Sequence, residues 1–176
     1  PKYATALGYE SQKSHHIYAV DLKGIDIPYL AYADTACAKS VGSQTGADEL
    51  IEYCKTTGTQ YAVVEDHEPF RFGPGKRIYS QTALILVVQW GNAVIVLRFS
   101  IVPQEIPFLV SKFVFKTLGG SLDLDDNILT LKRLGGAQEP LHDLATGHVG
   151  VALTKEGNAP PKVRQETLDL CIEGAE

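Results

Sequence analysis

A single aspartate, Asp34, ends an apolar run and is followed at once by small and hydroxylated residues. The stretch reads YLAYADTACAKSVGSQ from position 29 to position 44. An aspartate after a strand is most often a turn former or a helix N-cap. The residues that follow favour a second interpretation, because small side chains let a substrate backbone or another copy of the loop approach the carboxylate. The apolar run before Asp34 would also exclude part of the water around it.

A carboxylate held in a partly water-free place is suited to general acid–base chemistry. Two carboxylates about 3 Å apart cannot both ionise, and they therefore share one proton. The ionised carboxylate can accept a proton from water while the protonated one polarises a peptide carbonyl. Asp34 could take part in such a reaction only with a second acid beside it.

The sequence offers no second aspartate with the same surroundings. The three aspartates at 123–126 lie in an expected turn, without an apolar strand before them or a Thr-small pair after them. The stretch LATGHVG, 144–150, has Ala145 where the acid would be needed, and we interpret its likeness to the Asp34 loop as coincidence. A two-fold symmetric dimer would supply the second carboxylate, because Asp34 and its mate then meet on the axis.

The elements that would position Asp34 are mostly strands. Apolar or alternating runs bounded by turn residues predict strands, and amphipathic spacing closed by glycine predicts helices. The sequence therefore indicates a mainly β domain with one or two short helices. Strands are expected over 17–20, 27–33, 61–64, 82–90, 93–102, 107–110 and 147–153, hairpins over 70–80 and 121–131, and helices over 48–55, 111–118 and 163–172.

The same pattern divides the chain into three parts. We expect a flexible N-terminal arm over 1–14, a folded domain over 15–153 and a C-terminal tail over 154–176. Methionine is absent, including at position 1. This absence predicts that the chain is a fragment, such as a domain cut from a longer polyprotein.

Composition narrows the class of protein. Of 176 residues, 44% are hydrophobic and 21% are charged, as in soluble globular proteins. The net charge of -5 and the lack of a basic block argue against a nucleic-acid partner. The apolar runs are too short to span a membrane. Three widely spaced cysteines indicate a reducing compartment, and no ligand spacing predicts a metal or another cofactor.

Four blocks of the sequence, in this order, resemble the retropepsins, the aspartic proteases of retroviruses and LTR retrotransposons. The resemblance is narrower to the protease segment of retrotransposon Gag-Pol polyproteins, and it covers about 25–153. The blocks are ADTACAKSVGS, FRFGPGKRIYS, IPFLVSKFVFKTLGGSLDLDDNIL and GHVGVAL. The resemblance implies a retropepsin-like β-barrel that acts as a C2 homodimer on a peptide or polyprotein substrate. It also implies a site of action in the cytoplasm or within retroelement particles.

The resemblance assigns a role to each residue of the Asp34 loop. Asp34 is the expected catalytic acid, with water as the nucleophile. Thr35 would hydrogen-bond across the dimer, Ala36 would lie beside the substrate backbone where the family usually has glycine, and Cys37 would line the substrate pocket. The expected flap, which closes over a peptide as an added strand, carries Phe72, Gly73, Pro74 and Gly75.

The sequence departs from the retroviral pattern in two places. Val110-Ser111-Lys112 stands where retroviral members carry Gly-Arg-Asn or Gly-Arg-Asp. The helix expected over 48–55 lengthens the interval between Asp34 and the flap.

Several alternatives remain open at this point. The fold could serve as a catalytically silent module for peptide binding or dimerisation. It could also be a monomeric latent precursor whose arm or tail blocks the interface. Cys37 could act as a nucleophile if His67 or His142 supplied a base. The pair His15-His16 is interpreted as a surface feature rather than a metal site.

Overall fold

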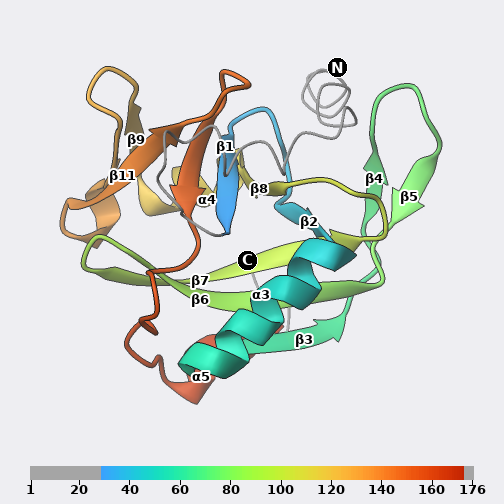
Figure 1. Ribbon diagram of the computed structural model, residues 1–176, viewed down its shortest axis with the longest axis horizontal. Coiled ribbons are helices and arrows are strands. Elements are labelled where there is room, and N and C mark those ends of the chain that lie inside the picture. Colours follow the sequence, from blue (N-terminus) through green and yellow to red (C-terminus); the bar gives the residue numbers. More distant parts are fainter. Residues whose placement is uncertain (1–28, 173–176) are drawn as a thin grey trace.

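Strands dominate the described part of the chain, which is residues 29–172 of a computed structural model (Figure 1). The expectation of a mainly β fold is confirmed. Three α-helices form among the described residues: two lie in the expected domain, and one lies in the expected tail, where a helix was expected over 163–172. The expected arm over 1–14 and the expected strand at 17–20 lie outside the described residues, as does the start of the strand expected over 27–33.

The strands are β1 (Leu30–Asp34), β2 (Val41–Ser43), β3 (Tyr61–Glu65), β4 (Pro69–Arg71), β5 (Arg77–Tyr79), β6 (Thr82–Trp90), β7 (Ala93–Val102), β8 (Phe108–Ser111), β9 (Gly120–Asp123), β10 (Ile128–Leu131), β11 (Ala137–Asp143) and β12 (Val149–Ala152). The helices are α3 (Gln44–Thr57), α4 (Lys112–Leu118), α5 (Gln165–Ile172) and the short 3-10 helix η1 (Lys132–Leu134).

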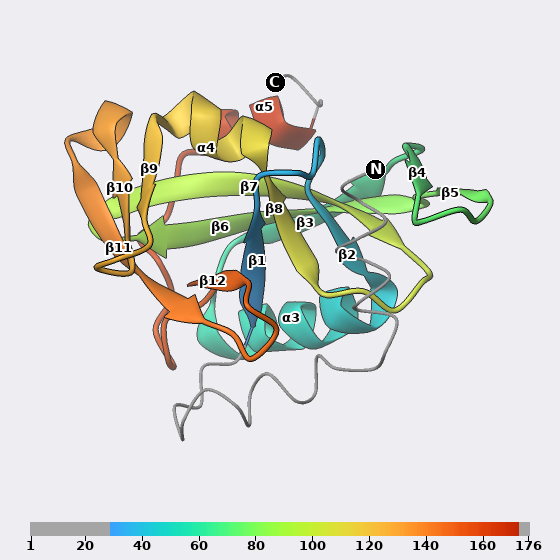
Figure 2. The same cartoon turned by 90° about the horizontal axis from the view of Figure 1, so that it is seen from above.

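Ten of these strands form one mixed sheet, and β4 and β5 form a separate hairpin. The order in the sheet is β3-β6-β7-β2-β8-β1-β12-β11-β10-β9. Strand β1 is parallel to β8 on one side and antiparallel to β12 on the other. The β4–β5 hairpin projects at the end of the molecule opposite to β9, β10 and β11 (Figure 1, Figure 2). Strand β1 is therefore held on both sides up to Tyr32, and its last residue, Asp34, is paired with Ser111 of β8.

Helix α3 is longer than the helix expected over 48–55. It begins earlier because the hydroxyl of Ser43 caps it, accepting a hydrogen bond from the Gly46 N–H at 3.0 Å. It ends at Gly58, whose φ of 80° lies in the left-handed region that glycine adopts without strain. Its buried side chains are Ala47, Leu50 and Cys54.

The β6–β7 hairpin is covered by helices on both faces. Helix α3 lies on one face and α5 on the other (Figure 2). Successive residues of β6 alternate between these faces. Leu84 and Leu86 join the core that includes α3, whereas Ile85 and Val87 pack with Leu168 of α5. Burial on both sides explains why β6 is an unbroken apolar run rather than an alternating one.

The chain after β12 is in contact with the rest of the domain. The hydroxyl of Tyr53 donates to the carbonyl of Lys155 at 2.8 Å. The side chain of Gln60 accepts from the N–H of Val163 at 2.7 Å and donates to its carbonyl at 3.1 Å. The helix expected over 163–172 forms as α5. These contacts fix the segment that leads from β12 to α5 against α3 and the start of β3.

Strand β11 has no counterpart among the expected elements. Its sequence AQEPLHD contains Pro140, which lacks the N–H that a paired strand donates. Its buried positions also include Glu139, whose side chain is 3% exposed and pairs with Lys155 at 2.5 Å. The local sequence pattern therefore disfavours a strand over these residues. The strand forms nevertheless, because its backbone pairs with β10 and β12. The last expected strand, 147–153, is present as β12, which is shorter and covers only Val149–Ala152.

No helix within residues 29–172 is both long enough and apolar enough to cross a bilayer.

Candidate active site

Asp34 is a buried carboxylate at the end of β1. Only 8% of the residue is exposed. Its Oδ1 accepts a hydrogen bond from the N–H of Ala36 at 2.9 Å. Its Oδ2 is buried and makes no hydrogen bond with any described residue. Because a buried carboxylate oxygen without a donor costs free energy, this atom marks a place where a hydrogen-bond donor is favoured.

The loop after Asp34 rests on the junction of β8 and α4. In the parallel pair β1–β8, Asp34 lies opposite Ser111. The Ser40 hydroxyl accepts from the Ser111 N–H, and the Cys37 carbonyl accepts from the Lys112 N–H, both at 3.0 Å. Both donors belong to the block where the sequence departs from the retroviral pattern. Because the donors are backbone groups, these contacts do not depend on the side chains of that block.

Ala36 occupies its position without backbone strain. Alanine in place of glycine is costly where φ is positive. Among the described residues, the non-glycine positions with positive φ are Tyr29 and Asn127. Ala36 is therefore accommodated, and its N–H still reaches the carboxylate of Asp34.

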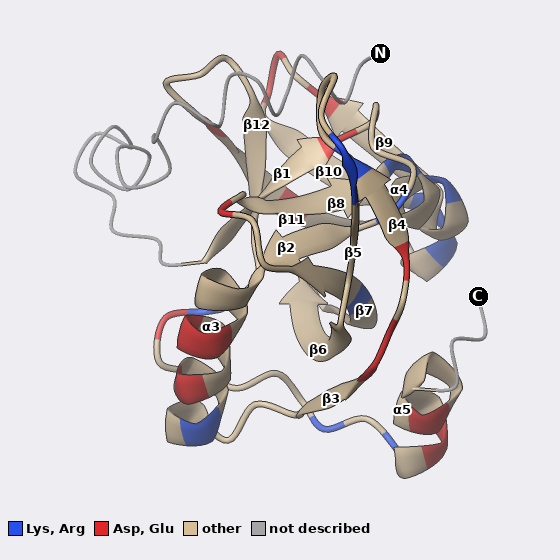
Figure 3. Ribbon diagram, turned by 90° about the vertical axis from the view of Figure 1, so that its right-hand side faces the viewer, with Lys and Arg blue, Asp and Glu red and all other residues tan. Residues whose placement is uncertain are grey.

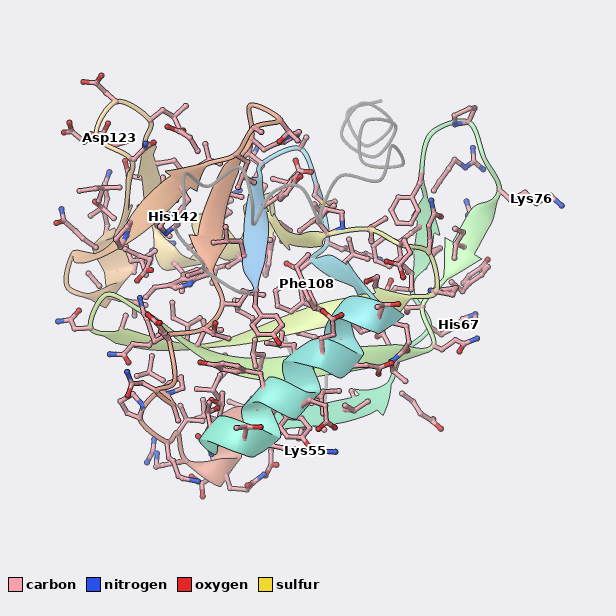
Figure 4. The ribbon with its side chains drawn as sticks, in the orientation of Figure 1. Lys55, His67, Lys76, Phe108, Asp123 and His142 are labelled. Carbon is pink, nitrogen blue, oxygen red and sulfur yellow. The ribbon has the colours of Figure 1, made fainter. Side chains whose placement is uncertain are left out.

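Thr35 and Cys37 face different surroundings. Thr35 is exposed at the tip of the loop. Cys37 is 1% exposed, and its thiol donates to the carbonyl of Lys39 at 2.8 Å. Such burial does not favour a nucleophilic thiol, because reactive cysteines are partly exposed. The two histidines considered as its base, His67 and His142, lie on opposite sides of the molecule (Figure 4).

The hairpin expected over 70–80 is present as β4 and β5. Phe70 is 5% exposed and belongs to a buried cluster that also contains Tyr32 of β1 and Cys37 of the Asp34 loop. Phe72 stacks on Phe70 with ring centroids 6.0 Å apart. This cluster, which we call the loop–hairpin cluster, joins the two expected parts of the site. Its buried members are Tyr32, Cys37, Val41, Phe70, Val102, Ile106, Leu109 and Leu144.

The tip of the hairpin carries the remaining expected flap residues. Gly73 has a φ of 69°, which favours glycine. Pro74 and Gly75 are exposed. Lys76 marks the outer end of the hairpin and His67 lies near its base (Figure 4). The structure thus brings Phe72 close to the loop–hairpin cluster and places the other three residues at the exposed tip.

The base of the hairpin holds charged contacts that the local sequence pattern does not predict. Lys39 of the Asp34 loop pairs with Glu68, just before β4. Asp66 accepts hydrogen bonds from Ser80, Ser100 and Arg98. Figure 3 shows the acidic segment between β3 and β4 that holds these carboxylates. The partners are far apart along the chain, and only the fold brings them together.

Burial alone would raise the pKa of Asp66. The hydrogen bonds from Ser80, Ser100 and Arg98, together with the charge of Arg98, outweigh burial and lower this pKa below its ordinary value of 3.8. The Asp66 carboxylate is therefore ionised in mildly acidic solution and keeps its contact with Arg98 there.

Two stretches considered as sources of a second acid have other contacts. Asp123 accepts hydrogen bonds from two backbone N–H groups of its own turn, each at 3.0 Å, and the expected turn between β9 and β10 is confirmed. The LATGHVG stretch leads into β12, beside β1. The His148 ring there lies against Tyr32 with ring centroids 4.7 Å apart.

Within residues 29–172, no cluster of three or more His, Cys, Asp or Glu side chains could hold a metal ion. No protein-family model matches the sequence, and no curated protein matches it. The functional interpretation therefore depends on the chemistry of the Asp34 loop and of the hairpin beside it.

Proposed function

We propose that the chain is one subunit of a homodimeric aspartic endopeptidase with a retropepsin-like fold. Its substrate would be a retroelement polyprotein, cut between large apolar or aromatic residues. The observation that carries the proposal is the buried Oδ2 of Asp34, which has no donor among the described residues. A second Asp34 carboxyl group, supplied by an identical subunit, would provide the missing proton.

The loop around Asp34 is suited to a two-fold contact. The exposed Thr35 offers a hydroxyl at the loop tip, where an identical loop could donate and accept hydrogen bonds reciprocally. Ala36 and Ala38 are small enough for close approach. Hydrogen bonds from the N–H groups of Ser111 and Lys112 hold the loop within its own subunit. The position of the loop therefore does not depend on the partner subunit alone.

In the proposed reaction, the two carboxyl groups exchange roles around a single proton. The ionised carboxylate accepts a proton from water, and the water oxygen attacks the peptide carbonyl carbon. The protonated carboxyl gives its proton to the carbonyl oxygen. As the resulting tetrahedral intermediate collapses, the carbon–nitrogen bond breaks, the departing nitrogen accepts a proton from the protonated carboxyl, and the other carboxylate takes a proton from a hydroxyl of the intermediate. The pair then again holds one proton. No covalent bond to the enzyme forms.

The β4–β5 hairpin would serve as the flap. Its buried Phe70 anchors it to the loop–hairpin cluster, while Pro74 and Gly75 at the tip remain exposed. An extended peptide lying between the hairpin and Asp34 could pair with it as an added strand. Closure of the tip would exclude water and align the scissile bond.

The decisive experiment compares Asp34→Asn with the wild-type chain on a mixture of peptides, with cleavage products identified by mass spectrometry. We expect Asp34→Asn to abolish cleavage and to remain a folded dimer in analytical ultracentrifugation. Asp126→Asn, an exposed turn residue, is the matched control and should cut like the wild type. Cleavage by Asp34→Asn at the wild-type rate would refute the mechanism.

Three further measurements separate this proposal from its alternatives. Cleavage should be fastest in mildly acidic solution, because the pair must hold one proton; a flat profile up to pH 9 would contradict it. Binding of pepstatin without any cleavage would indicate a catalytically silent module. A wild-type chain that sediments only as a monomer while cutting peptides would exclude the shared site.

A further inference from the structure

A partly buried ion pair lies at the base of the β4–β5 hairpin. Arg98 of β7 donates from Nη2 to Oδ1 of Asp66 at 3.0 Å. The hydroxyls of Ser80 and Ser100 donate to Oδ2 at 2.6 and 2.7 Å. The Asp66 side chain is 7% exposed and that of Arg98 is 23% exposed. Such a shielded and fully hydrogen-bonded pair holds its members far more firmly than a surface pair does.

Both ends of the hairpin are attached to this pair. On the entering side, the Asp66 N–H donates to the Gln81 carbonyl at 3.2 Å. On the leaving side, the Ser80 hydroxyl accepts from the Glu68 N–H at 2.8 Å while it donates to Asp66. The Ser80 N–H donates to the Glu68 carbonyl at 2.9 Å. The Asp66 carboxylate therefore fixes the point from which the hairpin extends.

The other side of Arg98 is attached to the end of helix α5. Its Nη1 donates to the carbonyls of Cys171 and Ile172, at 2.8 and 3.4 Å. These are carbonyls that a helix leaves without partners at its C-terminus, where a cation is also favoured by the helix dipole. Leu168, 5% exposed, packs with Ile85 and Val87 and holds the same helix on the sheet.

Arg98 and Cys171 also border a cavity of about 520 Å³ that reaches Lys39 and Ser40 of the Asp34 loop. Helix α5, the hairpin base and the Asp34 loop thus adjoin one space. Cys171 is only partly buried, so its thiol can report whether the end of α5 is in place.

We propose that helix α5 regulates the flap. In this proposal, which rests on the proposed protease function, docked α5 orients Arg98. Arg98 then orients Asp66, and Asp66 holds both ends of the β4–β5 hairpin. Arg98 and Asp66 act as positioning residues. Undocking of α5 would free the hairpin base, weaken closure over a peptide and raise KM more than it lowers kcat.

The test uses hydrogen–deuterium exchange of the full chain, with Arg98→Gln as the first variant. Arg164→Gln changes an exposed arginine just before α5 and serves as the matched control. We expect exchange over 66–81 to become about fivefold faster or more in Arg98→Gln. Exchange over 120–131, the β9–β10 hairpin, should stay unchanged. Alkylation of Cys171 should become faster in the same variant.

A second variant, Leu168→Ala, removes the buried contact of α5 with Ile85 and Val87 and is expected to undock α5 while both Asp66 and Arg98 are retained. It should accelerate exchange over 66–81 in the same way. Faster alkylation of Cys171 with unchanged exchange over 66–81 would overturn the proposal. An equal acceleration over 66–81 and 120–131 would also overturn it, because Arg98 would then only stabilise the whole fold.

Peptide cleavage separates this proposal from the proposed function. In a cleaving enzyme, both variants should raise KM by about fivefold or more, with a smaller change in kcat. A kcat loss with unchanged KM would contradict regulation through the flap. If the wild-type chain cuts no peptide, the protease proposal fails, and the exchange data alone decide whether α5 controls the hairpin.

Discussion

Asp34 and Ser111 lie directly opposite each other in the parallel pair β1–β8, and Ser40 of the Asp34 loop accepts a hydrogen bond from the Ser111 N–H. The loop thus closes back onto the strand beside its own aspartate. Ser40 is 8% exposed and Ser111 is 2% exposed, so water cannot easily replace this bond. The side chain of Ser40 therefore helps to hold the loop, together with the backbone bond from the Lys112 N–H to the Cys37 carbonyl.

We expect Ser40→Ala to destabilise the protein by about 1–3 kcal/mol, because it leaves the buried Ser111 N–H without an acceptor. Urea unfolding would measure the change. Ser121→Ala, at an exposed position of β9, should change the free energy of unfolding by less than about 0.5 kcal/mol. Equal effects of the two substitutions would show that the Ser40 contact does not hold the loop.

Phe70 tests whether the loop–hairpin cluster joins the hairpin to the site. Removal of a buried phenylalanine side chain costs about 3–5 kcal/mol when the surroundings cannot collapse. We expect Phe70→Ala to approach this cost in urea unfolding and to weaken peptide cleavage. Phe113→Ala, which alters a residue that is 51% exposed, should cost far less. A small cost at Phe70 would mean that the loop–hairpin cluster does not anchor the hairpin.

The local pattern of apolar and turn residues in the sequence is sufficient to predict much of the fold. The apolar runs of β6 and β7, the glycine-tipped hairpin and α4 carry their own periodicity and turn residues. Asp34 is recognisable for the same reason, since the apolar residues of β1 and the small residues after it are adjacent in sequence. These features need no knowledge of distant contacts.

The remainder depends on residues that meet only in the folded chain. Asp66 and Arg98 are 32 positions apart, and Lys39 and Glu68 are 29 apart. Glu139 obscures the alternation of β11 because its buried carboxylate is paired with Lys155. None of these three pairings has a periodic signal in the sequence. The two at the base of the hairpin, Asp66–Arg98 and Lys39–Glu68, could therefore not be derived from it.

Protonation of His142 should weaken the fold in acid. Burial lowers the pKa of this histidine below its ordinary value of 6.5, and nearby Lys155 lowers it while Glu139 raises it. The unfolded chain therefore binds a proton below pH 6.5 before the folded chain does, and stability falls as the pH decreases below 6.5. The loss is complete once the pH is below the folded-state pKa. Thermal unfolding of His142→Gln should lack this part of the decline.

The exposed His67, stacked on Tyr79 with ring centroids 4.4 Å apart, provides the matched substitution. His67→Gln should retain the wild-type loss of stability below pH 6.5. If His142→Gln and the wild type lose stability in parallel over this range, another group is responsible.

Alanine substitutions at the two glycines of the hairpin tip distinguish an effect of backbone strain from an effect of contact with substrate. Gly73 has a φ of 69°, so Gly73→Ala should strain the turn by about 1–2 kcal/mol. Gly75 has no positive φ, and an added Cβ would meet only the Phe72 carbonyl oxygen at 3.4 Å. Gly75→Ala should therefore leave urea unfolding unchanged. If a peptide backbone passes close to Gly75 in the proposed enzyme, Gly75→Ala should nevertheless raise KM. An unchanged KM in Gly75→Ala, together with unchanged unfolding, would exclude the tip of the hairpin from the substrate path.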